Sequence, residues 1–409
     1  MTTRWEHAAF WCAFGAAATS SVSIAASQSF LGLALAAMLA GRLRWRLPAH
    51  WPALAIFAGW TILSLAFSDA PRAGLPQIRK FYVWAMLFVV LSLFRSLRDV
   101  RWLAAAWLAG GTLSALRGLW QFAVKWSAAA NSGQDFYLAY VGHRITGFMS
   151  HWMTFSGQMM IVLLFGAALL LWGKPQRLLR WALIACLPVV ALALVLAFTR
   201  GVWIATAAGG VYLLWSWKRW TVALLPLAAL LAFAAGPAGL RQRLVSLVRP
   251  HGQTDSNLHR VYTMRTGIEM IKAHPLLGLG PERVGPHFTQ YVPPDLPKQL
   301  PEGYYGHLHN IYVHFAAERG LPAMLALVWF LVMNLRDWLS ALRAGAGDGV
   351  WALRAGAAVL IGILVTGLFE YNLGDSEILA MTLASLGAAP VAYLASRSSA
   401  PGTSAQSIP

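Results

Sequence analysis

Long apolar runs recur along almost the entire chain and alternate with short polar connections. Most of them approach the roughly 20 apolar residues that a helix needs to cross a bilayer. The pattern therefore predicts an all-α polytopic membrane protein with about twelve transmembrane helices. The predicted spans are residues 8–24, 27–41, 51–67, 80–94, 102–120, 155–172, 181–198, 201–217, 220–236, 320–335, 351–369 and 377–395. The first two are short and fit either two tilted spans or one hairpin.

Basic residues gather on one side of these spans. If the N-terminus lies in the cytoplasm, the inner loops contain the arginine and lysine clusters at residues 42–46, 95–101 and 174–180, whereas the short outer connections hold few bases. Cytoplasmic loops of membrane proteins are enriched in lysine and arginine in this way. The sequence therefore predicts that both termini face the cytoplasm.

Two outer segments, residues 121–154 and 237–319, are too long to be simple turns. Long loops beside rigid helices usually carry function, and the second is expected to form a mostly helical loop domain. These features divide the chain into residues 1–236 with the first nine spans, the loop domain at 237–319, the last three spans at 320–395, and a disordered cytoplasmic tail at 396–409.

The loop domain contains a segment with helical periodicity. Asp255, Ser256 or Asn257 can cap this helix, which is expected to end at His274 before a proline. The apolar residues at helical spacing are Val261, Met264, Ile268 and Ile271. This stripe is the face expected to pack against the membrane domain.

Composition excludes several classes of protein. Hydrophobic residues make up 58% of the chain and charged residues 11%, with a mean hydropathy of +0.56, whereas soluble proteins contain about 25% charged residues. An ordinary soluble enzyme and a disordered regulator are therefore excluded. The net charge of +17 is explained first by basic cytoplasmic loops, so no nucleic-acid partner is predicted. Because the long outer loops are also basic, we expect the outer face to bind an anionic group.

No residue pattern indicates a cofactor. Cys12 and Cys186 both lie in apolar stretches, which favours buried hydrophobic positions over a disulfide or a metal site. The chain has no Walker A motif and no dinucleotide fingerprint, and its few carboxylates are scattered rather than paired. We therefore expect no nucleotide and no metal.

Four arginines are candidates for binding the anion. Arg200 interrupts an apolar run at the outer membrane boundary, where a charge costs about 2.5–3.5 kcal/mol and usually marks a substrate path; the alternative is a snorkelling helix end. Arg260 and Arg265 share the predicted helix about 140° apart, with Arg265 on the apolar stripe. Arg144 lies in the first long loop. Arginine suits bidentate contact with phosphate, although a solvated position is an equal alternative for the last three.

Three histidines lie close together in the second long loop: His307, His309 and His314. Their spacing lacks the i,i+4 pair with a nearby acid that would indicate zinc. An imidazole at the membrane–water boundary is better suited to act as a general base, because imidazole titrates near neutral pH. A polar residue that caps a helix start is the alternative.

An ordered set of short motifs resembles the shared core of the O-antigen ligase and polymerase superfamily. The motifs cover about half of the chain and follow one another in the family order. They are Arg144-Ile-Thr-Gly-Phe148, Thr199-Arg-Gly-Val-Trp203, Arg260 at the start of a helix, His274-Pro-Leu-Leu-Gly-Leu-Gly280, His309-Asn-Ile-Tyr312 and Glu318-Arg-Gly-Leu-Pro322.

The resemblance implies a GT-C-like glycosyltransferase of the Gram-negative inner membrane, with its active site facing the periplasm. Such enzymes transfer a glycan from undecaprenyl pyrophosphate without metal or nucleotide, and a single displacement would invert the anomeric carbon. His309 would act as the catalytic base, with His307, Asn310 and His314 in support. Arg200 and Arg260 would be catalytic as well. The pyrophosphate would contact Arg144, Arg200, Arg260 and Arg265.

The acceptor distinguishes the branches of this superfamily. It is the lipid A–core oligosaccharide in the ligase, another glycan repeat in the polymerase, and a serine or threonine in protein O-oligosaccharyltransferases. The last group tends to have added C-terminal sequence, so the short tail here favours the ligase. A transporter of an anionic polyprenyl-linked lipid is the non-enzyme alternative. We see no repeated halves with broken helices to support it.

Overall fold

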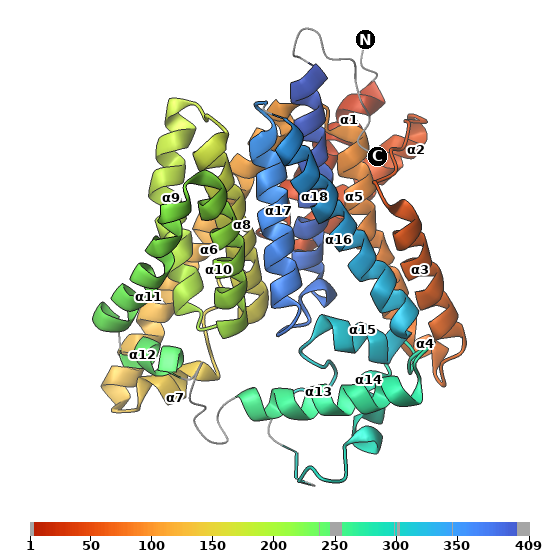
Figure 1. The fold of residues 1–409 in the computed structure, drawn as a ribbon, viewed down its shortest axis with the longest axis vertical. Coiled ribbons are helices and arrows are strands. Elements are labelled where there is room, and N and C mark those ends of the chain that lie inside the picture. The colour runs from red at the N-terminus through yellow and green to blue at the C-terminus, as the bar shows by residue number, and fades with distance from the viewer. Residues whose placement is uncertain are drawn as a thin grey trace.

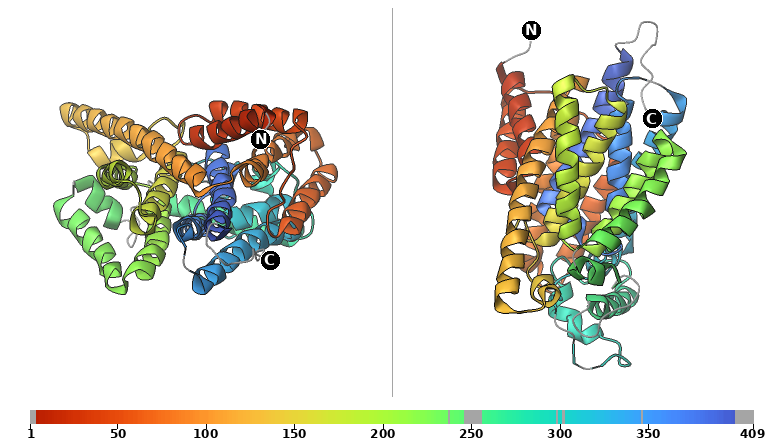
Figure 2. Two further views of the ribbon diagram at one scale, coloured as in Figure 1. Left: turned by 90° about the horizontal axis from the view of Figure 1, so that it is seen from above. Right: turned by 90° about the vertical axis from the view of Figure 1, so that its left-hand side faces the viewer.

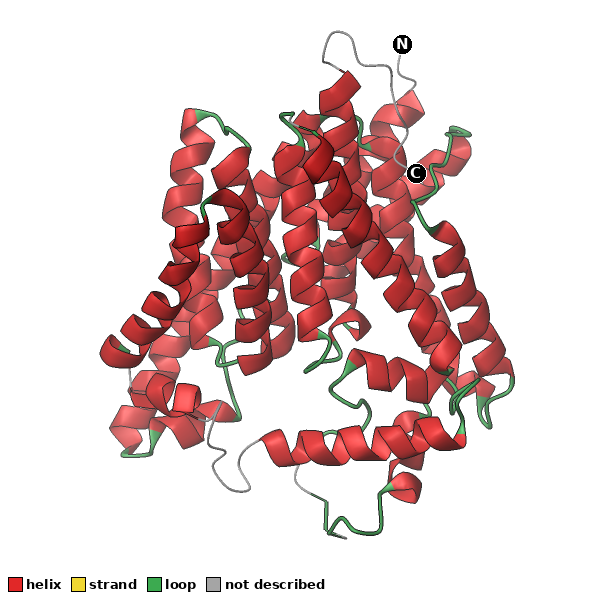
Figure 3. Ribbon diagram, in the orientation of Figure 1, coloured by secondary structure: helices red, strands yellow, loops and turns green. Residues whose placement is uncertain are grey.

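A bundle of helices, with further helices lying crosswise at one end, makes up the computed structural model of the protein (Figure 1). The structure describes residues 4–236, 238–245, 256–297, 299–300, 303–345 and 347–398. Within these ranges every regular element is helical (Figure 3), which confirms the all-α prediction. Asp255 and most of the tail at 396–409 lie outside the described residues.

The helices fall into two groups by place. The bundle contains α1 (Arg4–Thr19), α2 (Ile24–Ala40), α3 (Trp51–Ala66), α5 (Phe81–Leu93), α6 (Leu97–Ser132), α8 (Trp152–Trp172), α9 (Arg177–Leu196), α10 (Arg200–Trp217), α11 (Leu224–Ala235), α16 (Leu321–Ala344), α17 (Val350–Thr366) and α18 (Ser376–Ser398). The others are α4 (Pro71–Arg79), α7 (Phe136–Val141), α12 (Ala238–Val245), α13 (Ser256–Ala273), α14 (Val284–His287) and α15 (Ile311–Arg319), with 3-10 turns at Arg219–Ala223, Phe288–Tyr291 and Asn372–Gly374.

Several of these helices are suited to a bilayer. Among the described residues, five helical segments are long and apolar enough to cross it: Pro71–Leu93, Trp152–Trp172, Arg177–Leu196, Leu321–Arg343 and Ser376–Arg397. Four shorter apolar helical segments accompany them: Ile24–Ala40, Trp51–Ala66, Arg219–Ala235 and Val350–Thr366. These segments support a multi-pass membrane protein. Twelve spans and a GT-C-like arrangement remain predictions.

The first long outer segment begins later than its sequence suggests. Helix α6 starts with a capping box formed by Ser96 and Asp99 and continues to Ser132, where Gly133 ends it in a left-handed conformation. Residues 121–132 are therefore helix and not loop. The added turns are stabilised by packing, since the ring centroid of Phe122 lies 5.4 Å from that of Phe136 in α7.

Helices α17 and α18 form the middle of the bundle (Figure 2). Both pack against α8, and α17 also packs against α10. Small side chains line their buried faces, including Ala355, Gly356, Ala357 and Ala389. Small residues let helix backbones approach closely where lipid offers no hydrophobic drive to associate. The turn between these two central helices is thereby held firmly at the end of the bundle that carries α13.

Helix α13 lies across the end of the bundle, opposite the end where α1 starts and α18 finishes (Figure 1). Helix α13 packs on α15 and on the 3-10 turn Phe288–Tyr291. A small second core fills the space between them: Met270, Leu279, Val284, Phe288, Leu308 and Ala317. Two glycines permit the tight folding here, because Gly278 and Gly320 both have positive φ and their backbones nearly touch residues of the opposite segment.

The predicted buried face of α13 is wrong. Val261, Met264 and Ile268 are exposed, whereas the helix buries Tyr262, Thr263, Thr266 and Met270. Gly267 explains the reversal, since its missing side chain leaves room for Leu308 and Val313 to approach that face. Threonine side chains carry a methyl group and add to an apolar contact, which a stripe of large aliphatic residues does not reveal.

Candidate active site

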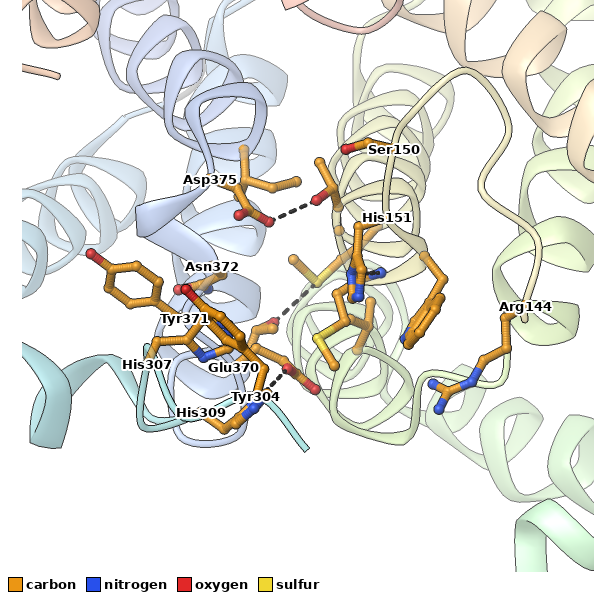
Figure 4. A pocket seen from close by; sticks show the side chains of 18 of the residues that line it. Arg144, Ser150, His151, Tyr304, His307, His309, Glu370, Tyr371, Asn372 and Asp375 are labelled. Atoms are coloured by element: carbon orange, nitrogen blue, oxygen red, sulfur yellow. Dashed lines mark hydrogen bonds and ion pairs between the residues drawn. The ribbon is translucent and has the colours of Figure 1, made fainter. Parts of the chain in front are cut away.

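One cavity of about 1000 Å³ opens beside α13, at the end of the bundle that carries this helix. Its walls come from α7 and the loop that follows it, the starts of α8 and α10, the segment before α15, and the turn between α17 and α18 (Figure 4). The lining therefore joins residues that are more than 200 positions apart, such as Arg144 and Glu370. The cavity brings the predicted base His309 and the predicted arginine Arg144 into one lining.

His309 lines this cavity from the segment that leads into α15. Asn310 caps α15, because its Oδ1 accepts hydrogen bonds from the backbone N–H groups of Tyr312 and Val313 at 3.0 Å each. The same asparagine donates from Nδ2 to the carbonyl oxygen of Leu368 at 3.2 Å. His309 itself has φ +49°, a left-handed conformation that costs a non-glycine residue energy and often occurs at functional sites. The cap thus fixes where the imidazole sits.

Glu370 meets two of the predicted catalytic residues. Its Oε1 accepts a hydrogen bond from Arg260 Nη2 at 2.6 Å, and its Oε2 lies 3.6 Å from His309 Nδ1. The carboxylate is 3% exposed and lines the cavity. Burial alone would raise the pKa of Glu370, but the charge of Arg260 and the proximity of His309 hold it below its ordinary value. The group is therefore a buried, ionised carboxylate.

Arg144 faces this pair from across the cavity (Figure 4). Its guanidinium lies 4.7 Å from the Trp152 ring centroid, and its Nε donates to the carbonyl oxygen of Val141 at 2.9 Å. Its Nη1 approaches the carbonyl oxygen of Phe198 at 3.4 Å, where Arg243 Nε also donates at 3.0 Å. Two arginines thus donate to the same carbonyl oxygen in the break between α9 and α10. Arg243 was not predicted as a site residue, because in the sequence it is one of many basic residues of the second long loop.

Arg200 begins α10 and is buried, with 5% of its surface exposed. Arg200 is not among the described residues that line the cavity, but Val202, two positions along α10, is. A Cβ atom added at Gly201 would lie 2.8 Å from Phe369 Cβ and 3.6 Å from Glu370 Oε1. The start of α10 is therefore directly behind Glu370.

Arg260 and Arg265 point in different directions, as their 140° separation predicts, but Arg260 and not Arg265 faces the bundle. Arg265 pairs with Asp295 at 2.8 Å on the surface of the loop domain, with 44% of its side chain exposed. It does not line the cavity. Arg260 turns toward the bundle instead, because α13 buries the face opposite to the predicted apolar stripe. We therefore omit Arg265 from the site proposed below.

The other histidines differ in position. The His307 ring centroid lies 4.3 Å from that of His309, and burial together with the neighbouring imidazoles lowers the pKa of His307 far below its ordinary value. His314 lies within α15, where it is 3.6 Å from Glu318, and it does not line the cavity. His259 was not predicted, yet its ring is 5.1 Å from that of His309. Of the three neighbours, His307 and His259 also line the cavity, whereas His314 does not.

The sequence analysis missed the acidic part of this site. Glu370 and Asp375 line the cavity from the turn between α17 and α18, and Glu377 lines it from the first turn of α18. Asp375 accepts a hydrogen bond from Thr154 Oγ1 at 2.7 Å, and burial raises its pKa to about 6. The available signal was the concentration of three acids in one short stretch of a chain that has only 15.

Comparison with known proteins supports the family resemblance. Residues 186–328 match the family model described as O-antigen ligase. The matched stretch includes Arg200, Arg260 and His309 but neither Arg144 nor Glu370. No curated protein matches the chain. At this level the match supports a glycosyltransferase-type enzyme that acts on lipid-linked glycans in a membrane. The match over residues 186–328 supports the predicted resemblance to the O-antigen ligase superfamily.

Proposed function

We propose that the protein is an O-antigen ligase, which transfers O-antigen polysaccharide from undecaprenyl pyrophosphate to the lipid A–core oligosaccharide. The proposal rests mainly on one observation: His309 and Arg144 line the same cavity. Arg200 and Arg260 lie near residues of that lining without lining it themselves. These are a candidate base and a set of cations, the two requirements for displacing a pyrophosphate from a sugar without a metal.

In the proposed reaction, His309 takes the proton from an acceptor hydroxyl as that oxygen attacks the anomeric carbon of the donor sugar. The bond between this carbon and the pyrophosphate oxygen breaks, and its electron pair stays on the pyrophosphate. Arg144 stabilises the negative charge that grows there, helped by the positive charge of Arg200. Because attack and departure occur on opposite faces, the anomeric configuration inverts.

The lining of the cavity suits an amphiphilic donor. Its polar groups come mainly from the segments outside the long helices, whereas Met160, Val202, Ile363 and Ile378 contribute apolar surface from α8, α10, α17 and α18. A polyprenyl pyrophosphate has the same division, with a charged group joined to an apolar chain. The cavity volume of about 1000 Å³ accommodates the charged group together with the sugars next to it.

Deleting the gene tests the function directly. We expect loss of all lipopolysaccharide bands above the core on a gel, while lipid-linked glycan still accumulates. Retention of a single-repeat band indicates a polymerase instead. An unchanged ladder with an altered glycoprotein pattern indicates a protein O-oligosaccharyltransferase, and failure of lipid-linked glycan to reach the outer face indicates a transporter.

The proposed location of the active site on the periplasmic side of the Gram-negative inner membrane makes a separate prediction. Exposed Lys272 in the loop domain is a suitable labelling site, whereas a position such as Gln253 lies outside the described residues. In a variant without Cys12 and Cys186, a membrane-impermeant thiol reagent added to intact cells is expected to label Lys272→Cys and to spare Arg44→Cys. Permeabilised cells should label both. Labelling of Arg44→Cys alone in intact cells contradicts this orientation.

A further inference from the structure

We infer that Glu370 is the positioning residue of the transfer reaction, with one carboxylate oxygen held by Arg260 and the other facing the imidazole of His309. The inference rests on the proposed function, because it assigns Glu370 a role toward the base of that reaction. It concerns a residue outside the stretch that matches the ligase family model.

Two buried polar atoms face each other across the gap between His309 and Glu370. His309 Nδ1 and Glu370 Oε2 are both buried, and neither has a hydrogen-bond partner among the described residues. They lie 3.6 Å apart. A movement of less than about 1 Å would bring them to hydrogen-bonding distance, near 2.8 Å. Catalytic hydrogen bonds are often long before substrate binds and shorten in the complex.

The pairing of these atoms determines which nitrogen of His309 can act as a base. An ionised carboxylate only accepts hydrogen bonds, so the proton of the neutral imidazole belongs on Nδ1. The lone pair is then on Nε2, the nitrogen available to the acceptor hydroxyl. In hydrolase triads a buried carboxylate orients its histidine in the same way and stabilises the imidazolium that forms. Glu370 occupies the equivalent place here.

Arg260 acquires a role from this arrangement. It does not line the cavity, and its guanidinium is bonded to Glu370 at 2.6 Å. A carboxylate with 4% of its side chain exposed needs such a partner to stay ionised. Arg144, across the cavity, also lowers the pKa of Glu370. Arg260 thus acts on the reaction through Glu370, without contact with the pyrophosphate.

The backbone fixes Glu370 and His309 relative to each other. The N–H of Ile311 donates to the carbonyl oxygen of Gly367 at 2.7 Å, and Asn310 donates to that of Leu368 at 3.2 Å. On the other side, Gly201 lets the start of α10 lie against Phe369. The carboxylate is therefore held between three segments that sequence separates widely.

The experiment is a double-mutant cycle on the purified, lipid-reconstituted enzyme, with undecaprenyl pyrophosphate-linked glycan as donor and lipid A–core as acceptor. Glu370→Gln keeps the shape and removes the charge. We expect kcat to fall about 10²-fold, less than the roughly 10⁴-fold of a triad carboxylate because the resting contact is long. The KM values should change little. Adding Glu370→Gln to His309→Asn should cause less than about a twofold further loss, because both changes remove the same function.

Asp295→Asn is the matched control, since Asp295 pairs with Arg265 of the same helix on the loop-domain surface. Its kcat should stay within about twofold of wild type. If Glu370→Gln does not accumulate as a monodisperse protein, Glu370→Asp replaces it, and its shorter side chain should leave intermediate activity that is again lost in the His309→Asn background. A full kcat in either Glu370 variant, or losses that multiply in the double variant, overturns the inference. A wild-type enzyme that elongates glycan instead of transferring it to lipid A–core overturns the proposed function alone, and the cycle then runs on elongation.

Discussion

Replacing His309 by asparagine is expected to lower the rate of glycan transfer about 10²–10⁴-fold, the usual cost of removing a general base. Asparagine is the informative substitute because it tolerates the left-handed backbone of this position, φ +49°, better than alanine does. Binding of the lipid-linked donor should be retained, since His309 acts on the acceptor hydroxyl. Transfer assays on the purified enzyme, together with donor binding, check both statements.

His307 and His314 provide the comparison. His314 is buried and lies 3.6 Å from Glu318, whereas half-buried His307 stacks on Tyr371, with ring centroids 5.5 Å apart. His307→Ala and His314→Ala should therefore reduce activity less than His309→Asn does. A His307 variant that is less active than the His309 variant would assign the base to the residue two positions upstream.

Removing Arg260 is expected to abolish most of the activity, whereas removing Arg265 from the same helix should change it less than about twofold. Arg260→Ala leaves the carboxylate of Glu370 buried without its 2.6 Å partner, which is strongly unfavourable. Arg265→Ala breaks only an exposed pair, and such pairs contribute little. Initial rates measured at saturating donor and acceptor compare the two variants at equal amounts of folded protein.

The conservative change at Arg260 separates charge from geometry. Arg260→Lys should recover part of the activity, because an ammonium group restores the charge but not the planar fork of the guanidinium. Equal losses in Arg260→Ala and Arg265→Ala would mean that the helix is needed only as a scaffold. Full activity in Arg260→Ala would remove this arginine from the site.

The helical segments of the chain could be read from its sequence, because burial in lipid demands long apolar runs with internal backbone hydrogen bonds. Ends of helices were harder to predict. Helix α6 continues to Ser132 because aromatic contacts with α7 stabilise turns that are not apolar enough to indicate a span. The prediction of the buried face of α13 was wrong for a similar reason, since Gly267 and the loop before α15 decide which side is buried.

The sequence by itself determined the residue types of the site: a histidine followed by a helix-capping asparagine, and arginines placed beside apolar runs. Their order also indicated the resemblance to the O-antigen ligase superfamily, which the match over residues 186–328 supports. Only the tertiary structure decided which of them meet. Glu370 is about 60 residues from His309 and about 110 from Arg260, so no local periodicity relates them. Packing of α17 against α8 and α10 brings its terminal turn beside α13 and α15. The carboxylate of Glu370 thereby bonds Arg260 at 2.6 Å and lies 3.6 Å from His309.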